Sequence, residues 1–446
     1  WTGVTATPPN NTTATLTVTA NTTVTVKFKP GTLEFENGDK PGAWARLIGE
    51  VSRADGAGTI IIDGVVKAGN TLGDFGEITV GRNLTIKGKN ASAVLDADGK
   101  SRIFYVPGGS GNGKTLILEN ITLKNGEADN GGGVYNEGTL IMEGSATVAP
   151  SAGAGKNDVY LASGAMITVN STLIPQGGIA AYITPGSYAE ERQVLTGSEV
   201  GSEYYKFEVT PESSTAEWII KSDGCLKKAE NVVSSSSATP WKDLKTAIID
   251  AHDGDIIVIN GEIKATDDPG NYGKIAITKS ITIKGKNKDT AILNANKNEN
   301  GKFPHYIFFV NGGKTVTLQN LTLTGGVSVN DSGAIGGAIF IAAASSSTTG
   351  SKVKMINCII KDNEATGDGG GGVYIGSNGT FTMDGESSSI TGNFVSGTGT
   401  GFAVYIDDEG TFNWIKGSIS DNEGGGKAVH KEPGGTFTNT SGNTAN

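Results

Sequence analysis

The sequence predicts an all-β protein made of two tandem parallel β-solenoid modules. Three observations predict it: the chain is duplicated, a shorter repeat of strands lies within a copy, and the composition is rich in Gly without a collagen period. Of 446 residues, 67 are Gly, 13 are Pro, and 18% are charged. The apolar content excludes wholesale disorder, and no apolar run approaches the roughly 18 residues that a membrane-spanning helix needs.

The duplication has a fixed offset. Residues 44–90 match residues 241–287 at a constant spacing of 197 positions, without a gap. The run IKGKN at residues 86–90 recurs unchanged at residues 283–287. Loop insertions make the offset drift further along the chain. A match of this length does not arise by chance, so the chain is a tandem duplication.

A shorter period appears in the second copy. Gly-Thr-Phe runs begin at residues 379, 410 and 435, with spacings of 31 and 25 residues. Each period holds about three strands of three to five residues, separated by Gly, Asn, Asp and Ser. Stacked coils of such strands bury their inward side chains together, which one coil cannot do alone. Asn tolerates the left-handed backbone of coil corners and can form amide ladders, and the expected corner residues are Asn120, Asn320, Asn363, Asn393 and Asn422.

A short helix is expected before each coil stack, at residues 44–54 and 240–252. In the second copy Thr239 is the expected N-cap and Pro240 the first helical residue, with apolar residues following at helical spacing. Such a helix would cover the open end of the stack. Strand alternation in the run that follows places Ile283, like its counterpart Ile86, inside the coil, and Lys284 outside and exposed.

The expected organisation has four parts. Residues 1–41 are a Thr-rich β segment, and residues 42–221 are the first module, closed by longer strands over residues 176–221 that do not resemble coils. Residues 222–239 are a Ser-rich linker with few contacts, so the modules should be separable there. Residues 240–446 are the second module.

The opening of the second module, residues 241–261, resembles the pectate-lyase-like right-handed parallel β-helices, in which a capping helix is followed by a Gly-Asp turn and a buried strand. The resemblance implies right-handed coils. The later coils resemble the polymorphic outer membrane protein repeats of bacterial surface proteins, through Gly336-Gly337-Ala338-Ile339 and an Ile-x-x-Asn motif that ends at Asn363, Asn393 and Asn422. Ile stands there where that family often has Phe. The two resemblances cover roughly residues 44–175 and 241–446.

No catalytic residue is predicted. A lyase of this fold would need clustered carboxylates holding Ca²⁺ and a nearby basic residue, and a hydrolase would need two carboxylates on one strand face. The adjacent pairs Asp407-Asp408 and Asp267-Asp268 point to opposite faces of a strand. The second copy contains no Arg. The recurring Tyr135, Tyr374 and Tyr405 are expected to stack between coils rather than to form a sugar platform.

No cofactor is predicted either, although a structural Ca²⁺ remains open at two acidic turns. His252, His305 and His430 lack metal-ligand spacing, and the two cysteines, Cys225 and Cys358, form no disulfide framework. The acidic turns contain Asp362, Glu364 and Asp368 in one case, and Asp421 and Glu423 in the other.

These features predict a non-enzymatic, exported bacterial surface protein that serves as a scaffold, an adhesin or a self-assembling subunit. The alternative is a carbohydrate-active β-helix, either a polysaccharide lyase or hydrolase or a glycan-binding module. The net charge of −10 with scattered basic residues argues against nucleic acid as a partner. The start at Trp1 suggests a removed leader and an extracellular or cell-surface location. Expected partners are a second copy, reached through the last coil or the coil flanks, or a surface protein or glycan.

Overall fold

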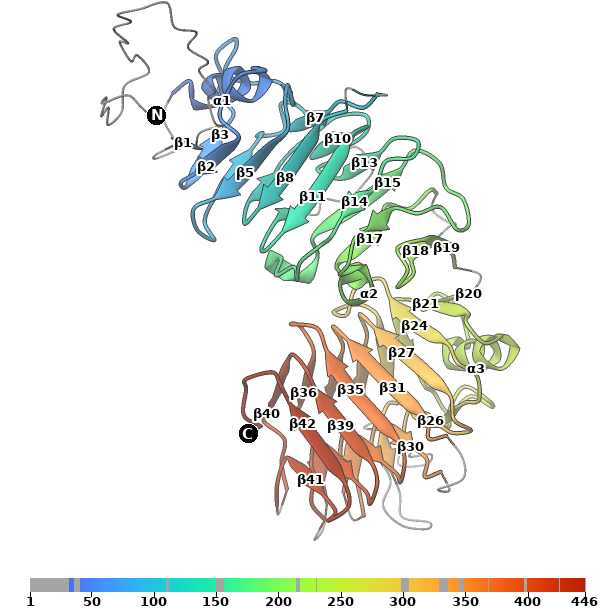
Figure 1. Ribbon diagram of the computed structural model, residues 1–446. Coiled ribbons are helices and arrows are strands. Elements are labelled where there is room, and N and C mark those ends of the chain that lie inside the picture. The colour runs from blue at the N-terminus through green and yellow to red at the C-terminus, as the bar shows by residue number, and fades with distance from the viewer. Residues whose placement is uncertain are drawn as a thin grey trace, which may run out of the picture.

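The computed structural model describes most of the chain (Figure 1). The described residues are 32–35, 41–109, 111, 113–149, 156–213, 217–229, 231–297, 305–328, 336–344, 349–367, 369–396, 399–424 and 426–445. Most of the Thr-rich segment 1–41 lies outside them, as does Asp368. Below, the first half means the described residues up to 229, and the second half means those from 231 onward.

The protein is an all-β solenoid of about 13 turns, which confirms the all-β and solenoid parts of the predicted fold class. Strands pair in parallel between successive turns, and the antiparallel pair among the described strands is β18 (Trp218–Ile220) with β19 (Leu226–Lys228). Helices are few in the described chain: α1 (Ala43–Ser52), α2 (Val200–Glu203), α3 (Pro240–Asp250) and the 3₁₀ turns η1 (Gln176–Gly178) and η2 (Tyr204–Lys206). None of these helices is long and apolar enough to cross a membrane.

Three parallel sheets form the walls of the first half. The first sheet contains β1 (Thr32–Phe35), β2 (Thr59–Ile62), β5 (Leu84–Gly88), β8 (Thr115–Glu119), β11 (Thr139–Glu143), β14 (Ile167–Thr168) and β16 (Leu195–Thr196). The second contains β4 (Ile78–Thr79), β7 (Phe104–Val106), β10 (Val134–Asn136), β13 (Val159–Leu161), β15 (Ala181–Pro185) and β17 (Phe207–Val209). The third contains β3 (Val65–Lys67), β6 (Val94–Asp96), β9 (Thr122–Lys124) and β12 (Thr147–Val148).

The second half has four parallel sheets, and none of its described strands joins a sheet of the first half. The largest contains β20 (Asn231–Ser234), β21 (Ile256–Asn260), β24 (Thr282–Gly285), β27 (Thr315–Gln319), β31 (Lys352–Ile356), β35 (Thr380–Asp384), β39 (Thr411–Trp414) and β42 (Thr436–Asn439). The next contains β22 (Glu262–Lys264), β25 (Ile292–Asn294), β28 (Thr322–Thr324), β32 (Ile359–Lys361), β36 (Ser389–Thr391) and β40 (Ser418–Ser420). The other two contain β23 (Ile275–Ile277), β26 (Phe308–Val310), β30 (Ile339–Ile341), β34 (Val373–Ile375), β38 (Val404–Ile406) and β41 (Val429–Lys431), and β29 (Val327–Ser328), β33 (Glu364–Ala365) and β37 (Phe394–Val395).

Duplicated residues take equivalent places in the two halves. Ile86 on β5 pairs with Ile60 on one side and Leu118 on the other, and Ile283 on β24 pairs with Ile257 and Leu318 in the same way. Ile86 and Ile283 have no exposed surface, so the predicted inward direction of both is confirmed. Each half has its own buried apolar cluster.

The predicted capping helices are present as α1 and α3. Trp44, Leu47 and Val51 of α1 are fully buried, and α3 buries Trp241, Leu244 and Ile248 in the same pattern. Pro240 is the first residue of α3, as predicted. Thr239 is the N-cap residue, but its hydroxyl makes no capping bond to the backbone. The indole nitrogens of Trp44 and Trp241 donate to Gly76 O and Gly273 O, both at 2.9 Å, which ties each helix to the first turn of its stack.

Two segments differ from the expected organisation. Residues 222–239 contain β19 and β20, and β20 pairs with β21 as the first strand of the largest sheet, just as β1 pairs with β2 in the first half. Residues 181–209 also continue the coils, because β15, β16 and β17 add parallel strands to existing sheets, whereas β18 pairs antiparallel with β19. Short strands on both sides of each capping helix therefore belong to the solenoid itself.

Side-chain ladders connect the turns, as the sequence predicted. Asn363 Nδ2 donates to Asn393 Oδ1, and Asn393 Nδ2 donates to Asn422 Oδ1, both at 2.9 Å. Asn120 and Asn320 occupy left-handed corners, each with φ of 53°. Aromatic rings also stack on the outer face, with centroids 4.7–5.8 Å apart, in the series Tyr105, Tyr135 and Tyr160 and the series Phe309, Phe340, Tyr374, Tyr405 and His430.

Candidate functional site: the junction between the two halves

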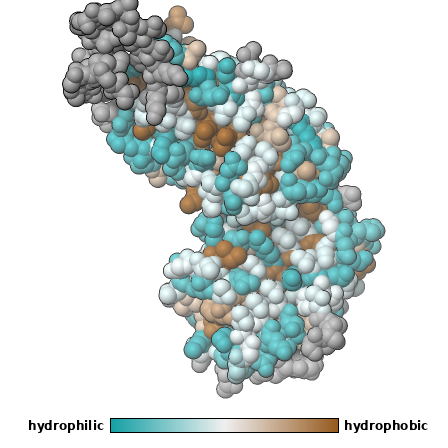
Figure 2. All heavy atoms as spheres, in the orientation of Figure 1, coloured by the Kyte–Doolittle hydropathy of each residue, from teal (hydrophilic) through white to brown (hydrophobic). Residues whose placement is uncertain are grey.

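The last turn of the first half packs against the outer face of the largest sheet of the second half. Figure 1 shows β17 and β18 beside β21 and β24, where the path of the chain changes direction. Ile256 and Val258 point away from their own core, because Ile257 and Ile259 fill the inward positions, yet they are only 8% and 3% exposed. Figure 2 shows hydrophobic residues where the halves meet, and a further group on the flank of the first half.

A buried ion pair crosses this junction. Lys284 Nζ on β24 lies 2.6 Å from Glu208 Oε2 on β17, and the two side chains are 7% and 11% exposed. Asn320 Nδ2 donates to the other carboxylate oxygen, Glu208 Oε1, at 2.9 Å. Both carboxylate oxygens are therefore satisfied by the opposite half, which a buried charge requires.

The expectation that Lys284 is exposed is wrong. The side chain does point out of its coil, as the alternation predicted, but the outer face at that position is covered by β17 of the first half. Its counterpart in the first copy, Lys87, also points outward and pairs with Glu119 at 2.6 Å, but these side chains are 41% and 27% exposed. The same residue in the same motif thus has two environments.

Further polar contacts extend the junction. Lys286 of the second half forms an ion pair with Glu217. Lys227 on β19 donates to Gly254 O at 3.2 Å and lies 3.6 Å from Asp255 Oδ1. The two halves are therefore coupled through charged and apolar contacts, in contrast to the few contacts expected near the linker.

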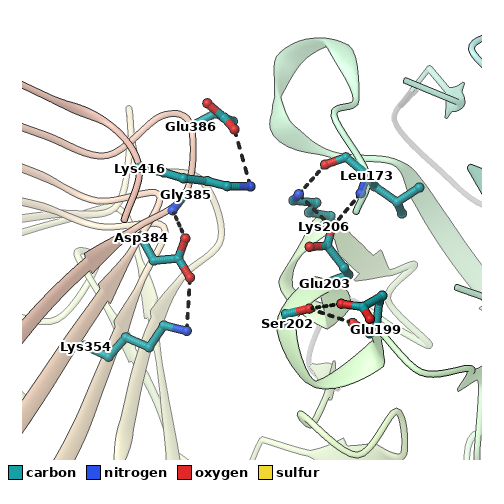
Figure 3. Close-up of polar contacts among 10 residues, drawn as sticks. All are labelled: Leu173, Glu199, Ser202, Glu203, Lys206, Lys354, Asp384, Gly385, Glu386 and Lys416. Carbon is teal, nitrogen blue, oxygen red and sulfur yellow. Dashed lines mark hydrogen bonds and ion pairs between the residues drawn. The ribbon is translucent and has the colours of Figure 1, made fainter. Parts of the chain in front are cut away.

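A second buried ion pair lies at the edge of the junction, on the 3₁₀ turn η2 and helix α2 (Figure 3). Lys206 Nζ lies 2.7 Å from Glu203 Oε2, with side chains 2% and 4% exposed, and the same carboxylate oxygen accepts from Leu173 N at 2.9 Å. Lys206 also donates to Leu173 O. Burial lowers the pKa of the Lys206 ammonium, and the neighbouring Glu203 opposes that shift.

Charged residues of the second half face this pair. Figure 3 shows Lys416, which pairs with Glu386 at 3.3 Å, extending toward the ribbon that carries Lys206. Asp384 accepts from Gly385 N at 2.7 Å and pairs with Lys354 at 3.1 Å. Burial, and then the charge of Asp384, raises the pKa of the Tyr205 phenol.

The acidic pairs considered as catalytic residues accept hydrogen bonds at turns. Asp408 Oδ1 accepts from Gly434 N at 2.7 Å, and Asp407 Oδ1 accepts from Asp408 N at 2.9 Å. Asp268 Oδ2 accepts from the hydroxyl of Thr266 at 2.9 Å, and both Asp267 and Asp268 are exposed.

Among the residues that the structure describes, those considered as metal ligands do not form a group of three. Within the described chain, the one group of three possible ligands is Glu191, Asp223 and Cys225, none of which was predicted. Lys221 Nζ already lies 2.8 Å from Glu191 and 3.0 Å from Asp223, and burial raises the pKa of the Cys225 thiol. His305 is buried and packs against Trp241, with ring centroids 5.3 Å apart. Ca²⁺ at the two acidic turns stays a prediction.

Sequence reasoning missed the junction, although one signal for it was present. The run Ile256-Ile257-Val258-Ile259 is apolar at four successive positions, which indicates a strand buried on both faces. The equivalent run in the first copy is Thr59-Ile60-Ile61-Ile62, in which Thr59 and Ile61 are only partly buried. No signal in the sequence identified Glu208 as the partner of Lys284, since 76 residues separate them.

The sequence matches no protein-family model, and neither the curated proteins nor the solved structures that were searched include a match to it.

Proposed function

We propose that the protein is a non-enzymatic scaffold of the bacterial cell surface, a rigid bent rod whose flanks and ends contact a second copy, a surface protein or a glycan. The observation that carries the proposal is the junction. Two coil stacks joined by a flexible linker would move independently, but here Lys284 and Asn320 of one stack saturate the carboxylate of Glu208 on the other. A buried pair of this kind favours one arrangement of its surroundings over others.

The outer charges of the first half support the same role. Cationic side chains pair with carboxylates of neighbouring turns rather than gathering in one place: Lys89 with Glu34 and Asp63, Lys67 with Asp98, and Lys87 with Glu119. These pairs, like the Asn and aromatic ladders, run along the stack and connect one turn to the next. Side chains that are paired in this way stabilise the stacking of one turn on the next.

Small-angle X-ray scattering tests the proposed rigidity. We expect the scattering profile of the 446-residue chain to match one bent particle with the described junction. A profile that requires an ensemble of independently oriented halves would contradict the proposal.

Enzymatic assay tests the non-enzymatic character separately. We expect no product release from a panel of acidic and neutral polysaccharides. Release of unsaturated oligosaccharides that is abolished by Asp407→Asn or Asp408→Asn would instead support the carbohydrate-active alternative. Sedimentation across a concentration series then shows whether the partner is a second copy.

A further inference from the structure

A crevice of about 230 Å³ opens beside the buried ion pair, between the two halves. One wall comes from η2 and β18 of the first half, and the other comes from the outer face of β21, β24 and β27. The lining includes Tyr204, Ile219, Ile256, Thr282, Thr317 and Gln319. The crevice therefore exists only when the halves are joined as described.

The crevice contains polar groups that the protein does not use. Gln319 lines the crevice, and its carboxamide makes no hydrogen bond to any described residue. The carboxamide is not among the fully buried polar atoms that lack a partner, so it is open to the crevice. The hydroxyls of Tyr204, Thr282 and Thr317 are likewise without a partner in the described part of the chain. Polar groups that line a crevice and have no protein partner are available to a water or a ligand.

The chemistry of these groups defines a ligand class. Three hydroxyls and one carboxamide can each donate and accept, so they match ligand hydroxyls, which also do both. Ile219, Ile256 and the Tyr204 ring provide apolar surface for the carbon–hydrogen face of a ring. The crevice is smaller than the roughly 300–1,000 Å³ pockets that hold drug-sized ligands, so one ring fits and an extended chain does not.

The charges of the crevice argue for a neutral ligand. Lys284 is neutralised by Glu208, and Lys221, also in the lining, is held by Glu191 and Asp223. Asp384 is close enough to raise the pKa of Tyr204, after the larger effect of burial. No free cation among these residues is available to a carboxylate or phosphate.

We propose that this crevice binds a single neutral sugar ring, either a free monosaccharide or the end of a glycan chain, with Gln319 and Thr317 as its principal hydrogen-bonding residues. The inference goes beyond the scaffold role and does not depend on it. A failed binding experiment would leave the scattering result unchanged, so the two proposals fail separately.

Ligand-observed saturation-transfer NMR on the full chain tests the site. The probes are glucose, galactose, mannose and N-acetylglucosamine, with glucuronate as the charged comparison. We expect at least one neutral sugar to bind and glucuronate to bind less well. We expect Gln319→Leu and Thr317→Val each to weaken binding about tenfold, because each removes a hydrogen bond from a buried site.

Thr382→Val is the matched control. Thr382 occupies the same row of the same sheet as Thr317, since Thr317 pairs with Lys354 and Lys354 pairs with Thr382, but it does not line the crevice. This variant should bind as the unchanged protein does. Melting temperatures close to that of the unchanged protein would show that all three variants are folded. If Gln319→Leu does not fold, Thr317→Val alone tests the site.

Methyl glycosides distinguish the two sources of the ligand. Retained binding of the methyl glycoside assigns the site to a glycan end, whereas lost binding assigns it to a free sugar, and either result supports the sugar site. Absence of binding across the panel, preference for glucuronate, or equal binding by Gln319→Leu, Thr317→Val and the unchanged protein would overturn the proposal.

Discussion

Substitution of Lys284 by Ala tests the junction most directly. The Lys284 Nζ to Glu208 Oε2 distance is 2.6 Å and both side chains are nearly buried, so the substitution leaves the Glu208 carboxylate with Asn320 as its remaining cross-junction partner. Removal of one member of a buried pair costs about 3–5 kcal/mol, since an uncompensated charge stays in the interior. We expect a loss of stability of that order, or partial separation of the halves where separation relieves the cost.

The duplication supplies the control for this experiment. Lys87→Ala removes the equivalent side chain of the first copy, whose pair with Glu119 is also 2.6 Å long but solvent-exposed. Exposed pairs contribute about 0–1 kcal/mol, so this variant should differ little from the unchanged protein. The comparison holds the local sequence constant and varies only the environment.

Guanidinium unfolding measures the loss of stability, and small-angle scattering measures separation of the halves. Fluorescence of Trp218, which is 8% exposed at the junction, reports separation of the halves. The double variant Lys284→Ala/Glu208→Gln should recover part of the lost stability, because it also removes the negative charge that Lys284→Ala leaves unpaired at residue 208. Equal, small effects of Lys284→Ala and Lys87→Ala, with unchanged scattering, would refute the assigned role of the junction.

Three other predictions concern the coils. Ile283→Asp buries a carboxylate among apolar residues and should cost several kcal/mol in a thermal or denaturant melt, and near-normal stability would contradict its inward position. Asn393→Ala interrupts the amide ladder and should cost about 1–3 kcal/mol in the same assay, because it leaves partners on both neighbouring turns unsatisfied. Hydrogen bonds from Lys100, and then Lys67, hold the pKa of Asp98 at about 2, below its usual 3.8. The stabilising effect of Asp98 should therefore be present above pH 4 and be lost as the pH falls toward 2. Melting temperatures from pH 5 to pH 2 should decline less steeply for Lys100→Met than for the unchanged protein, and parallel curves would contradict this assignment.

Much of the fold was predictable because its signals are local. Period-two alternation placed Ile86 and Ile283 inside the coil, and helical spacing of Trp241, Leu244 and Ile248 identified the capping helix. The position of Asn363 in a repeated motif predicted its place in a ladder, since residues at equivalent positions of a stack become neighbours. In each case the contact follows from the repeat itself.

The strand β20 was not predictable in this way, because its short run leads directly into the four serines 234–237 and resembles a linker. Pairing with β21 gives that run its structure, and only the stacked coil supplies a partner edge.

Residue patterns alone predict the solenoid, the duplication and the directions of Ile86, Ile283 and Lys284 relative to their own coils. What packs against the outer face of a coil depends on contacts between residues far apart in the chain. Lys87 and Lys284 occupy identical local sequences, and one is exposed while the other is buried against Glu208. Alternation along a strand fixes which side of the coil a residue faces, but its solvation depends on what else packs there. For Lys284, Gln319 and Tyr204, the residues that cover the side chain come from the other half of the molecule. No local sequence pattern predicts these contacts.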